Sequence, residues 1–194
     1  MGKSLKKDLI ADAALACFLA SSYNGTSMDE IVKVSGLSKG GIYWHFKSKD
    51  EIFLYIIENR FSEWNTELLT RLKSDDSPKE ALSKFVEFFL ELILAPVLAL
   101  IHEFLLHIKD KEMLDRACGI MNHSNNSNII KQVIQDGIDK GEFRALDPET
   151  AANVFTGIFE GLSLQWFTQY NDQKVLERTA KTALDIFFEG ISNK

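Results

Sequence analysis

Residues 38–51 read SKGGIYWHFKSKDE, and this stretch decides the fold of the N-terminal part of the chain. It holds a glycine pair between two serines, Ser38 and Ser48, and the second serine stands three residues before Glu51. A serine at a helix start accepts a hydrogen bond from a free backbone N–H, and a glutamate three residues later completes a capping box. We therefore expect a short helix from Ser38 and a longer helix from Ser48.

The segment before this stretch predicts another helix and a tight turn. Ser27 and Glu30 again have capping-box spacing, and Gly36 lies in a three-residue turn, where it can adopt a positive φ. A helix, a three-residue turn that contains glycine and a second helix with a polar, basic start form a helix-turn-helix. In that motif the second helix lies in the major groove of DNA, so we expect the helix from Ser38 to be the recognition helix.

Gly40 and Gly41 stand where helix-forming residues would be expected. Each glycine costs a helix about 1 kcal/mol relative to alanine. The absence of two Cβ atoms lets the backbone approach DNA closely, which is a functional reason to tolerate this cost. The alternative is that both glycines belong to a loop before a helix that begins near Ile42.

Hydrogen-bond donors and cations follow the glycine pair. Tyr43 and His45 end the short helix, and Lys47 and Lys49 flank the next helix start, where free N–H groups and the helix dipole favour phosphate. The residues that we expect to contact DNA are Thr26, Ser27, Ser38, Lys39, Gly40, Gly41, Tyr43, Trp44, His45, Lys47 and Lys49.

Charge is distributed unevenly along the 194 residues. The net charge is −6, but residues 1–50 hold seven lysines and five carboxylates, a net charge of +2. A mildly basic N-terminal part followed by an acidic remainder suits a protein that contacts phosphate groups with one end only.

The composition, 45% hydrophobic and 26% charged, is that of a soluble globular protein large enough to fold without disulfides. Cys17 and Cys118 form no C-x-x-C pair and fit a reducing, cytoplasmic setting. Charged residues interrupt the most apolar segment, residues 85–108, so we expect no membrane-spanning helix and a cytoplasmic protein.

Helical periodicity continues to the end of the chain, and a polar run at residues 122–128 predicts an exposed loop. Besides the helix-turn-helix pair, helices are predicted over residues 4–21, 49–73, 78–94, 97–108, 109–120, 129–140, 148–170 and 173–189. The sequence therefore predicts an all-α fold of about nine helices. Residues 1–48 would form a three-helix helix-turn-helix domain, and residues 49–194 a second helical domain.

Residues 10–52 resemble the DNA-binding domain of tetracycline-repressor-like (TetR family) bacterial regulators. The most specific match is the run G-L-S-K-G-x-I-Y-x-H-F-x-S-K at residues 36–49, which combines turn, cap, recognition helix and hinge. The other matching residues are Ile10, Ala13, Ala14, Phe18, Tyr23, Thr26, Ile31 and Ser35. The resemblance covers roughly the first quarter of the chain.

The match has departures. Ser22 stands where the family usually has a glycine, and Val32 replaces a small residue at the contact between the two helices of the motif. Gly41 is often threonine or serine in relatives, which puts one DNA contact in doubt. Trp44 occupies a variable position, from which it would reach the sugar-phosphate backbone or a thymine methyl group.

The resemblance implies a ligand-responsive repressor that binds a palindromic operator as a dimer. Its recognition helices would lie about 34–36 Å apart, and a small apolar or aromatic effector would release it. An activator of the same family fits the sequence as well. Residues 49–194 would then form the ligand-binding and dimerisation domain.

Aromatic and polar side chains of the body are candidates for the ligand pocket, although such a cluster is usually core. The candidates are Phe89, His102, Glu103, Phe104, His107, Met121, Phe155, Phe159 and Trp166. The two C-terminal helices suit a dimer bundle or, equally, an intrachain core. The interface candidates are Gly157, Gly161, Leu162, Leu176, Ala180, Leu184 and Phe187.

The segment His102-Glu103…His107 is H-E-x-x-x-H, not the H-E-x-x-H of zinc proteases. A five-residue step places two histidines about 140° apart on a helix, so they cannot share a metal ion. The sequence shows no nucleophile elbow and no phosphate-binding loop. We therefore expect no metal, no cofactor and no enzyme activity, and we keep a helical protein–protein adaptor as the alternative function.

Overall fold

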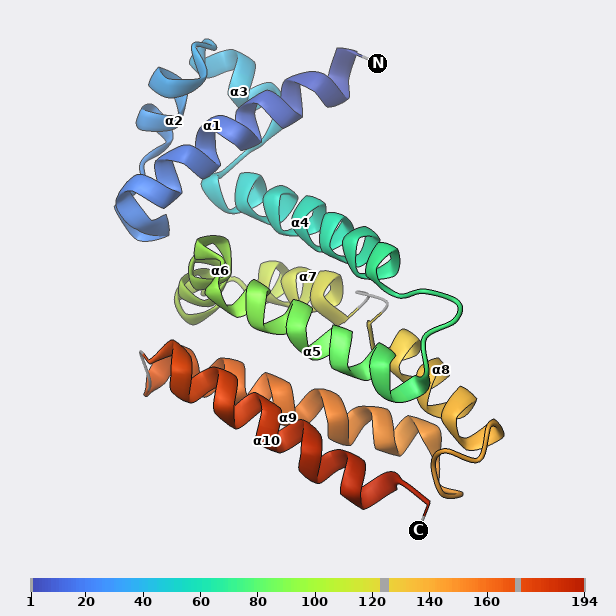
Figure 1. Cartoon of the computed structure of the whole chain (residues 1–194). Coiled ribbons are helices and arrows are strands. Elements are labelled where there is room, and N and C mark those ends of the chain that lie inside the picture. Colours follow the sequence, from blue (N-terminus) through green and yellow to red (C-terminus); the bar gives the residue numbers. More distant parts are fainter. Residues whose placement is uncertain (1, 123–125, 170–171, 194) are drawn as a thin grey trace. The chain divides into compact units, whose positions relative to one another are not determined.

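The structure is a computed structural model that describes residues 2–122, 126–169 and 172–193. In these ranges the regular elements are ten α-helices, and one isolated antiparallel bridge joins Phe143 to Ser192 (Figure 1). The helices are α1 (Gly2–Gly25), α2 (Met28–Ser35), α3 (Lys39–His45), α4 (Lys49–Arg71), α5 (Pro78–Leu94), α6 (Pro96–His107), α7 (Lys111–Asn122), α8 (Asn126–Asp139), α9 (Pro148–Thr168) and α10 (Gln173–Ile191). The all-α prediction is confirmed, with ten helices where about nine were expected.

The helices pack as two compact units. Unit 1 comprises Met1–Glu63 and Pro96–His123, and unit 2 comprises Trp64–Ala95 and Ser124–Lys194. Helix α4 therefore runs from one unit into the other, and α6 and α7 pack with the N-terminal helices. This division by packing differs from the predicted division by function after residue 48, which stays a prediction.

The core of unit 1 is aromatic. Phe18 and Tyr23 of α1, Phe53 of α4 and Phe104 of α6 form a cluster whose ring centroids are 4.9 to 5.3 Å apart. Ile10, Ala14 and Phe18 are fully buried, so α1 turns this stripe inward and leaves the neighbouring stripe that begins at Leu9 partly exposed. Such rings bury large apolar areas, and they fix α6 against α1 and α4.

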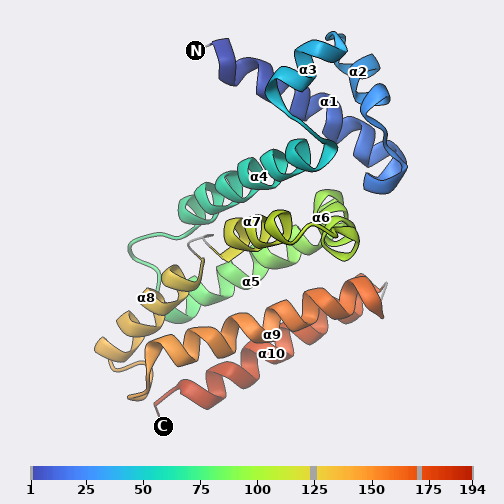
Figure 2. The ribbon, with the colours of Figure 1, turned by 180° about the vertical axis from the view of Figure 1, so that it is seen from behind.

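The core of unit 2 is a second aromatic cluster, contributed by α5, α9 and α10. Phe155 lies at its centre, with its ring centroid 5.7 Å from Phe85, 4.8 Å from Phe159 and 5.0 Å from Phe187. Helices α9 and α10 run antiparallel and side by side, as both ribbon views show (Figure 2). Helix α8 packs against α5 and α9 in the same unit.

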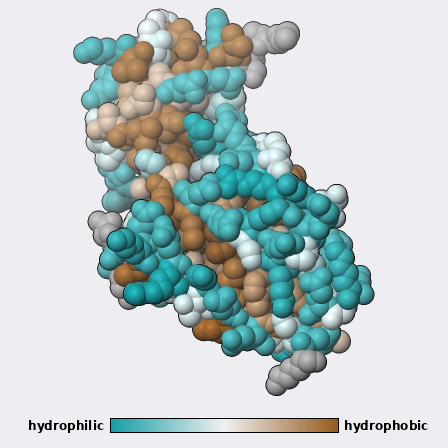
Figure 3. Space-filling model, in the orientation of Figure 1, coloured by the Kyte–Doolittle hydropathy of each residue, from teal (hydrophilic) through white to brown (hydrophobic). Residues whose placement is uncertain are grey.

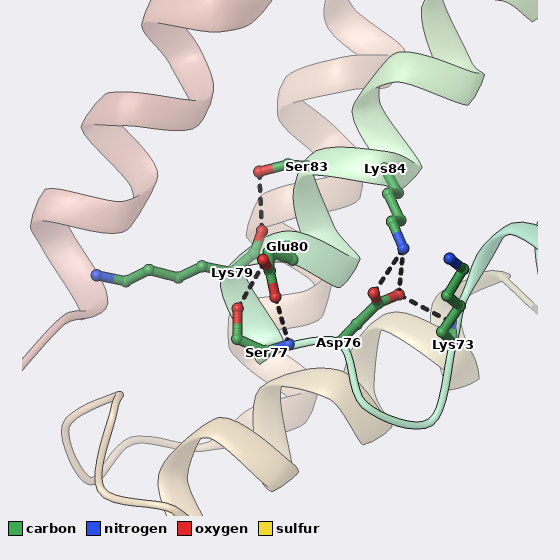
Figure 4. A network of polar contacts seen from close by, with 7 residues as sticks. All are labelled: Lys73, Asp76, Ser77, Lys79, Glu80, Ser83 and Lys84. Carbon is green, nitrogen blue, oxygen red and sulfur yellow. Dashed lines mark hydrogen bonds and ion pairs between the residues drawn. The ribbon is translucent and has the colours of Figure 1, made fainter.

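A polar network fixes the connection from α4 to α5 (Figure 4). Ser77 and Glu80 form the predicted capping box, with Pro78 in the first turn of α5. The Asp76 carboxylate binds the Lys84 ammonium at 2.5 Å and accepts a hydrogen bond from the Lys73 amide at 2.8 Å. The loop is therefore tied to the helix that it precedes.

Two boundaries differ from the sequence prediction. Helix α6 begins at Pro96 itself, because proline is well suited to the first turn of a helix. The predicted loop at residues 122–128 is shorter, since α7 includes Asn122 and α8 begins at Asn126, and residues 123–125 lie outside the described residues. No single helix in the described part of the chain is long and apolar enough to cross a membrane, and α5 and α6 pass that test only as a bent pair.

Candidate nucleic-acid interface

The helix-turn-helix forms as its caps predict. The Ser27 hydroxyl accepts a hydrogen bond from the Glu30 amide, and the Glu30 carboxylate accepts one from the Ser27 amide at 2.7 Å. The hydrogen bonds that the Glu30 carboxylate accepts from the Ser27 amide and the Ser27 hydroxyl hold the pKa of Glu30 below its usual value. Gly36 ends α2 with φ 66°, a left-handed conformation that glycine adopts at little cost.

Helix α3 has one buried and one exposed side. Ile42 on α3 and Phe46 at its C-cap are buried in unit 1, whereas Tyr43 is 43% exposed and Trp44 is 78% exposed. A helix so anchored presents its remaining side chains to solvent in a fixed orientation. Seven of the predicted DNA contacts are exposed: Ser27, Ser38, Lys39, Gly40, Tyr43, Trp44 and Lys47.

The glycine pair lies inside α3, so the alternative of a loop before Ile42 is wrong. The Ser38 hydroxyl accepts a hydrogen bond from the Gly41 amide at 3.2 Å. A Cβ on Gly41 would lie 3.2 Å from that hydroxyl, which gives this glycine a structural role in the cap. A Cβ on Gly40 would meet no atom of the chain within 4 Å, so the fold itself does not require glycine there.

Two other predicted DNA contacts, Lys39 and His45, already have defined environments within the protein. The Lys39 ammonium lies 2.8 Å from Asp29, in an exposed ion pair that raises the pKa of Lys39. His45 is half-buried, and its Nδ1 atom is buried without a hydrogen-bond partner in the described part of the structure. Lys39 would have to exchange Asp29 for a phosphate to contact DNA.

Thr26 and Lys49 face the protein in this structure. Thr26 is only 3% exposed, and its hydroxyl donates a hydrogen bond to the Ser22 carbonyl at 2.8 Å. The Lys49 ammonium donates to the carbonyl oxygens of Tyr23 at 2.7 Å and Thr26 at 2.9 Å, and it lies over the Tyr23 ring. Burial lowers the pKa of Lys49. The predicted phosphate contact of Lys49 would therefore require its side chain to leave both carbonyls.

The start of α4 departs slightly from the predicted capping box. The Ser48 hydroxyl accepts a hydrogen bond from the Glu51 amide, as expected. The Glu51 carboxylate, however, accepts from the Lys47 amide at 2.7 Å rather than from Ser48.

The ligand candidates of unit 1 have other roles or lie near the surface. Phe104 is buried in the aromatic cluster, and the Glu103 carboxylate accepts hydrogen bonds from the Tyr23 and Asn24 amides, each at 3.1 Å. His107 is exposed, with Nδ1 2.8 Å from the Glu103 carbonyl. His102 and Met121 are half-buried, and burial lowers the pKa of His102.

In unit 2, two of the ligand candidates are core residues. Phe155 and Phe159 are fully buried, and the half-buried Phe89 ring packs 5.5 Å from Phe159. Trp166 lines a small cavity of about 110 Å³ between α9 and α10, together with Leu176 and Thr179. That volume holds a few water-sized groups and is too small for a drug-sized ligand.

The interface candidates fall into two groups. Their apolar members, Leu162, Leu176, Ala180, Leu184 and Phe187, are buried within unit 2. The intrachain alternative is therefore the one that the structure supports for them, because their side chains already pack against the same chain. Gly157 is exposed and Gly161 is half-buried.

On the outer face of α9 and α10, the sequence predicted the interface glycines Gly157 and Gly161 but not the exposed apolar side chains. Val154 and Leu164 of α9 and Ile186 of α10 are each more than half exposed. Val154 and Ile186 also line a groove of about 440 Å³ with Ile158 and Gly190. Figure 3 shows apolar surface left exposed among the polar residues on one face of unit 2. The signal was present as a second apolar stripe, at positions 154, 158, 161 and 164, next to the core stripe.

Comparison with known proteins agrees with this geometry. The family model "Bacterial regulatory proteins, tetR family" matches residues 10–56, and the model "QacR-like protein, C-terminal region" matches residues 60–193. The chain belongs to the TetR family. The resemblance inferred from residues 10–52 is thereby confirmed and extends to the helical body.

The relatives of this TetR-family chain are regulators. The fatty acid metabolism regulator protein of Bacillus subtilis (strain 168) is 24% identical over 188 residues, 95% of each chain. The crystal structure of FadR from Bacillus subtilis in complex with stearoyl-CoA has a TM-score of 0.74 and 22% identity, over 94% of this chain and 98% of that one. The structure of AibR with isovaleryl coenzyme A and operator DNA has a TM-score of 0.65 and 18% identity, over 94% and 98%.

A TetR-family chain is a helix-turn-helix transcription regulator and not an enzyme. In the described residues, no group of three or more His, Cys, Asp or Glu side chains is placed to hold a metal ion. The family departure at Ser22 is accommodated by an unusual backbone, since this serine has φ 64° and ψ 169°.

Proposed function

We propose that this chain is a homodimeric repressor that binds a palindromic operator with α3 and releases it when an acyl-coenzyme A thioester binds the helical body. The exposed side of α3 carries the DNA-binding part of the proposal. Two aromatic side chains, Tyr43 and Trp44, project from a helix whose inner side is anchored by Ile42. A major groove admits a helix of this kind, and exposed polar and aromatic groups at its front reach base edges and sugar-phosphate.

Binding to selected DNA tests the first part. Rounds of selection from random duplexes with the purified protein should enrich a palindrome, and the affinity for that duplex should fall steeply with salt because phosphate contacts release counterions. Enrichment of no sequence would contradict the proposal and favour the adaptor alternative.

Trp44→Ala isolates the contribution of α3. We expect about tenfold weaker binding to the selected duplex, since tryptophan is enriched among the interface residues whose truncation costs more than about 1 kcal/mol, and we expect no loss of thermal stability. Leu106→Ala is the control, because Leu106 is 77% exposed on α6, outside the helix-turn-helix. Equal affinities of both variants would place Trp44 outside the DNA interface.

The outer face of α9 and α10 supports the dimer. Gly157 and Gly161 lie in α9 and Gly190 lies in α10, and a Cβ on any of them would meet no other part of the same chain within 4 Å. Glycine weakens a helix interior, so its presence next to exposed Val154 and Ile186 suits the close approach of a second copy.

Ile186→Glu tests this face. Ile186 is 63% exposed, so the substitution should leave the fold of one chain intact and place two charges in the interface. Sedimentation should show a monomer, and the affinity for the operator should be lower than that of the wild-type protein. Leu69→Glu, at an exposed leucine of α4, is the control and should remain dimeric. A dimer of unchanged affinity in Ile186→Glu would refute this interface.

The effector class rests on the relatives with bound stearoyl-CoA and isovaleryl coenzyme A. Both ligands combine a large, charged coenzyme A group with an acyl chain, so only the acyl chain matches the small apolar effector expected from the sequence. Stearoyl-CoA and isovaleryl-CoA should each be tested for release of the selected duplex, with free coenzyme A as the control. If neither thioester lowers DNA affinity, the effector class is wrong while DNA binding stands.

The choice between repressor and activator needs transcription in vitro. A promoter that carries the selected palindrome should give less transcript when the protein is added. More transcript would identify an activator.

A further inference from the structure

The link between α1 and α2 is held by residues from two other helices of unit 1. Helix α1 breaks at Ser22, and a single turn, residues 23–25, follows before the buried Thr26. The amides of Tyr23 and Asn24 donate to the two carboxylate oxygens of Glu103 on α6, each at 3.1 Å. Glu103 therefore accepts hydrogen bonds from the first two N–H groups that follow the break in α1.

Lys49, in the first turn of α4, holds the other end of the same turn. Its ammonium donates to the Tyr23 and Thr26 carbonyl oxygens. In a helical turn the N–H groups point toward one end and the carbonyl groups toward the other. A carboxylate on the N–H side and an ammonium on the carbonyl side therefore clamp the turn in one position.

The Tyr23 side chain completes the clamp. Its hydroxyl donates to the Asp50 carboxylate, and its ring packs in the aromatic cluster with Phe104. Burial and this hydrogen bond raise the pKa of Tyr23, so the phenol stays protonated. The clamped turn leads directly to Ser27, the N-cap of α2.

We infer that Glu103 is a positioning residue for DNA binding. By holding the turn at residues 23–25, it fixes the point from which α2 and α3 begin, although it lies on α6 and does not belong to the helix-turn-helix. This inference rests on the proposed DNA-binding function. It also assigns to Glu103 a role other than the ligand contact predicted from the sequence.

Charge-assisted hydrogen bonds to a carboxylate are about twice as strong as neutral ones. In Glu103→Gln the charge is lost, and the side-chain amide can accept through one oxygen only, so one backbone amide loses its acceptor. The turn then has more freedom in the unbound protein, and DNA binding must order it. We expect about tenfold weaker DNA binding, because lost preorganisation reduces affinity.

The experiment compares three variants with the wild-type dimer on the duplex that the wild-type protein selects from random DNA. Glu103→Gln is the test, and Glu103→Asp, which keeps the charge but is shorter by one methylene group, serves if the first variant does not fold. Glu58→Gln is the control, since Glu58 is an exposed glutamate on α4 in unit 1. Affinities are measured well below each melting temperature, so that a loss of stability does not count as a loss of binding.

Amide hydrogen exchange supplies a readout that does not depend on DNA. Glu103→Gln should speed exchange at Tyr23 and Asn24 and also in α2 and α3, while Glu58→Gln should change none of these. Together with the tenfold loss of affinity, that result supports the inference.

Wild-type affinity in Glu103→Gln, or tighter binding, would overturn it. Faster exchange confined to Tyr23 and Asn24 would also overturn it, because Glu103 would then order only its own partners. If the wild-type protein selects no duplex, the proposed function fails, and the exchange data still decide whether Glu103 orders α2 and α3.

Discussion

Ser22 combines an unusual backbone with several hydrogen bonds. Its φ of 64° and ψ of 169° lie in a region that is almost restricted to glycine and costs other residues about 1–3 kcal/mol. Its hydroxyl accepts a hydrogen bond from the Gly25 amide at 3.2 Å, and its carbonyl accepts from the Thr26 hydroxyl. A serine thus occupies the position where the family usually has glycine, because local hydrogen bonds offset part of the cost.

We expect Ser22→Gly to raise the free energy of unfolding by about 1 kcal/mol, since relief of backbone strain exceeds the loss of the hydrogen bonds that the Ser22 hydroxyl makes with Gly25 and Glu103. Urea unfolding measures the difference. Ser21→Gly is the matched control, because Ser21 is exposed in regular helix, and this change should lower stability by about 0.5 kcal/mol. A decrease of the same size in both variants would show that Ser22 is not strained.

At the same scale, the sequence predicts caps well and side-chain partners poorly. Ser27, Ser38 and Gly36 behave as predicted, because a cap depends on residues within one turn. The partners of Lys49 lie 23 and 26 residues away in the chain, so its position beside carbonyl groups cannot be inferred from the helix start alone. The positive charge of Lys49 suggested a phosphate contact, but in the folded chain the backbone carbonyl oxygens of Tyr23 and Thr26 accept its hydrogen bonds.

At the scale of elements, periodicity identifies helices but does not distinguish a core from an interface. The apolar residues of α9 form a wide surface, of which Phe155 and Phe159 face the core and Val154 and Leu164 face solvent. Both stripes have helical spacing and consist largely of apolar residues. Only the positions of α5, α8 and α10 decide which stripe is covered, and the sequence does not provide them.

The cap of α5 gives a test at this scale. In Figure 4 the Ser77 hydroxyl accepts from the Glu80 amide, whereas the Ser83 hydroxyl donates to the Lys79 carbonyl inside the helix. Ser77→Ala should lower the free energy of unfolding by about 1 kcal/mol, because a helix start loses its cap. Ser83→Ala removes a hydroxyl that the helix does not need and should change stability by less than about 0.5 kcal/mol. Equal urea midpoints for the two variants would show that the capping box contributes nothing measurable.

At the scale of the whole molecule, folding changes the proton affinity of groups in both units. Carboxylates that accept hydrogen bonds in the folded state have lowered pKa values: Glu30, Asp76, Glu80, Glu91, Glu103 and Asp147. For Glu103, partial burial opposes ionisation, but hydrogen bonds from the Asn24 and Tyr23 amides outweigh it. Burial also lowers the pKa of His102, so the folded chain binds this proton only at a lower pH than an exposed histidine does.

These shifts predict that stability decreases in two stages as the pH is lowered. Below the ordinary histidine pKa of 6.5, the unfolded chain binds a proton at His102 that the folded chain binds only at lower pH, so stability declines as pH decreases. The depressed carboxylates contribute stability that is complete above the ordinary values of 3.8 and 4.5 and is lost as pH falls through their folded values. Urea unfolding from pH 7.5 to 3 should show a shallow decline followed by a steep one. His102→Gln should reduce the first decline and leave the second, and a wild-type stability that rises between pH 7 and 5.5 would contradict the assignment.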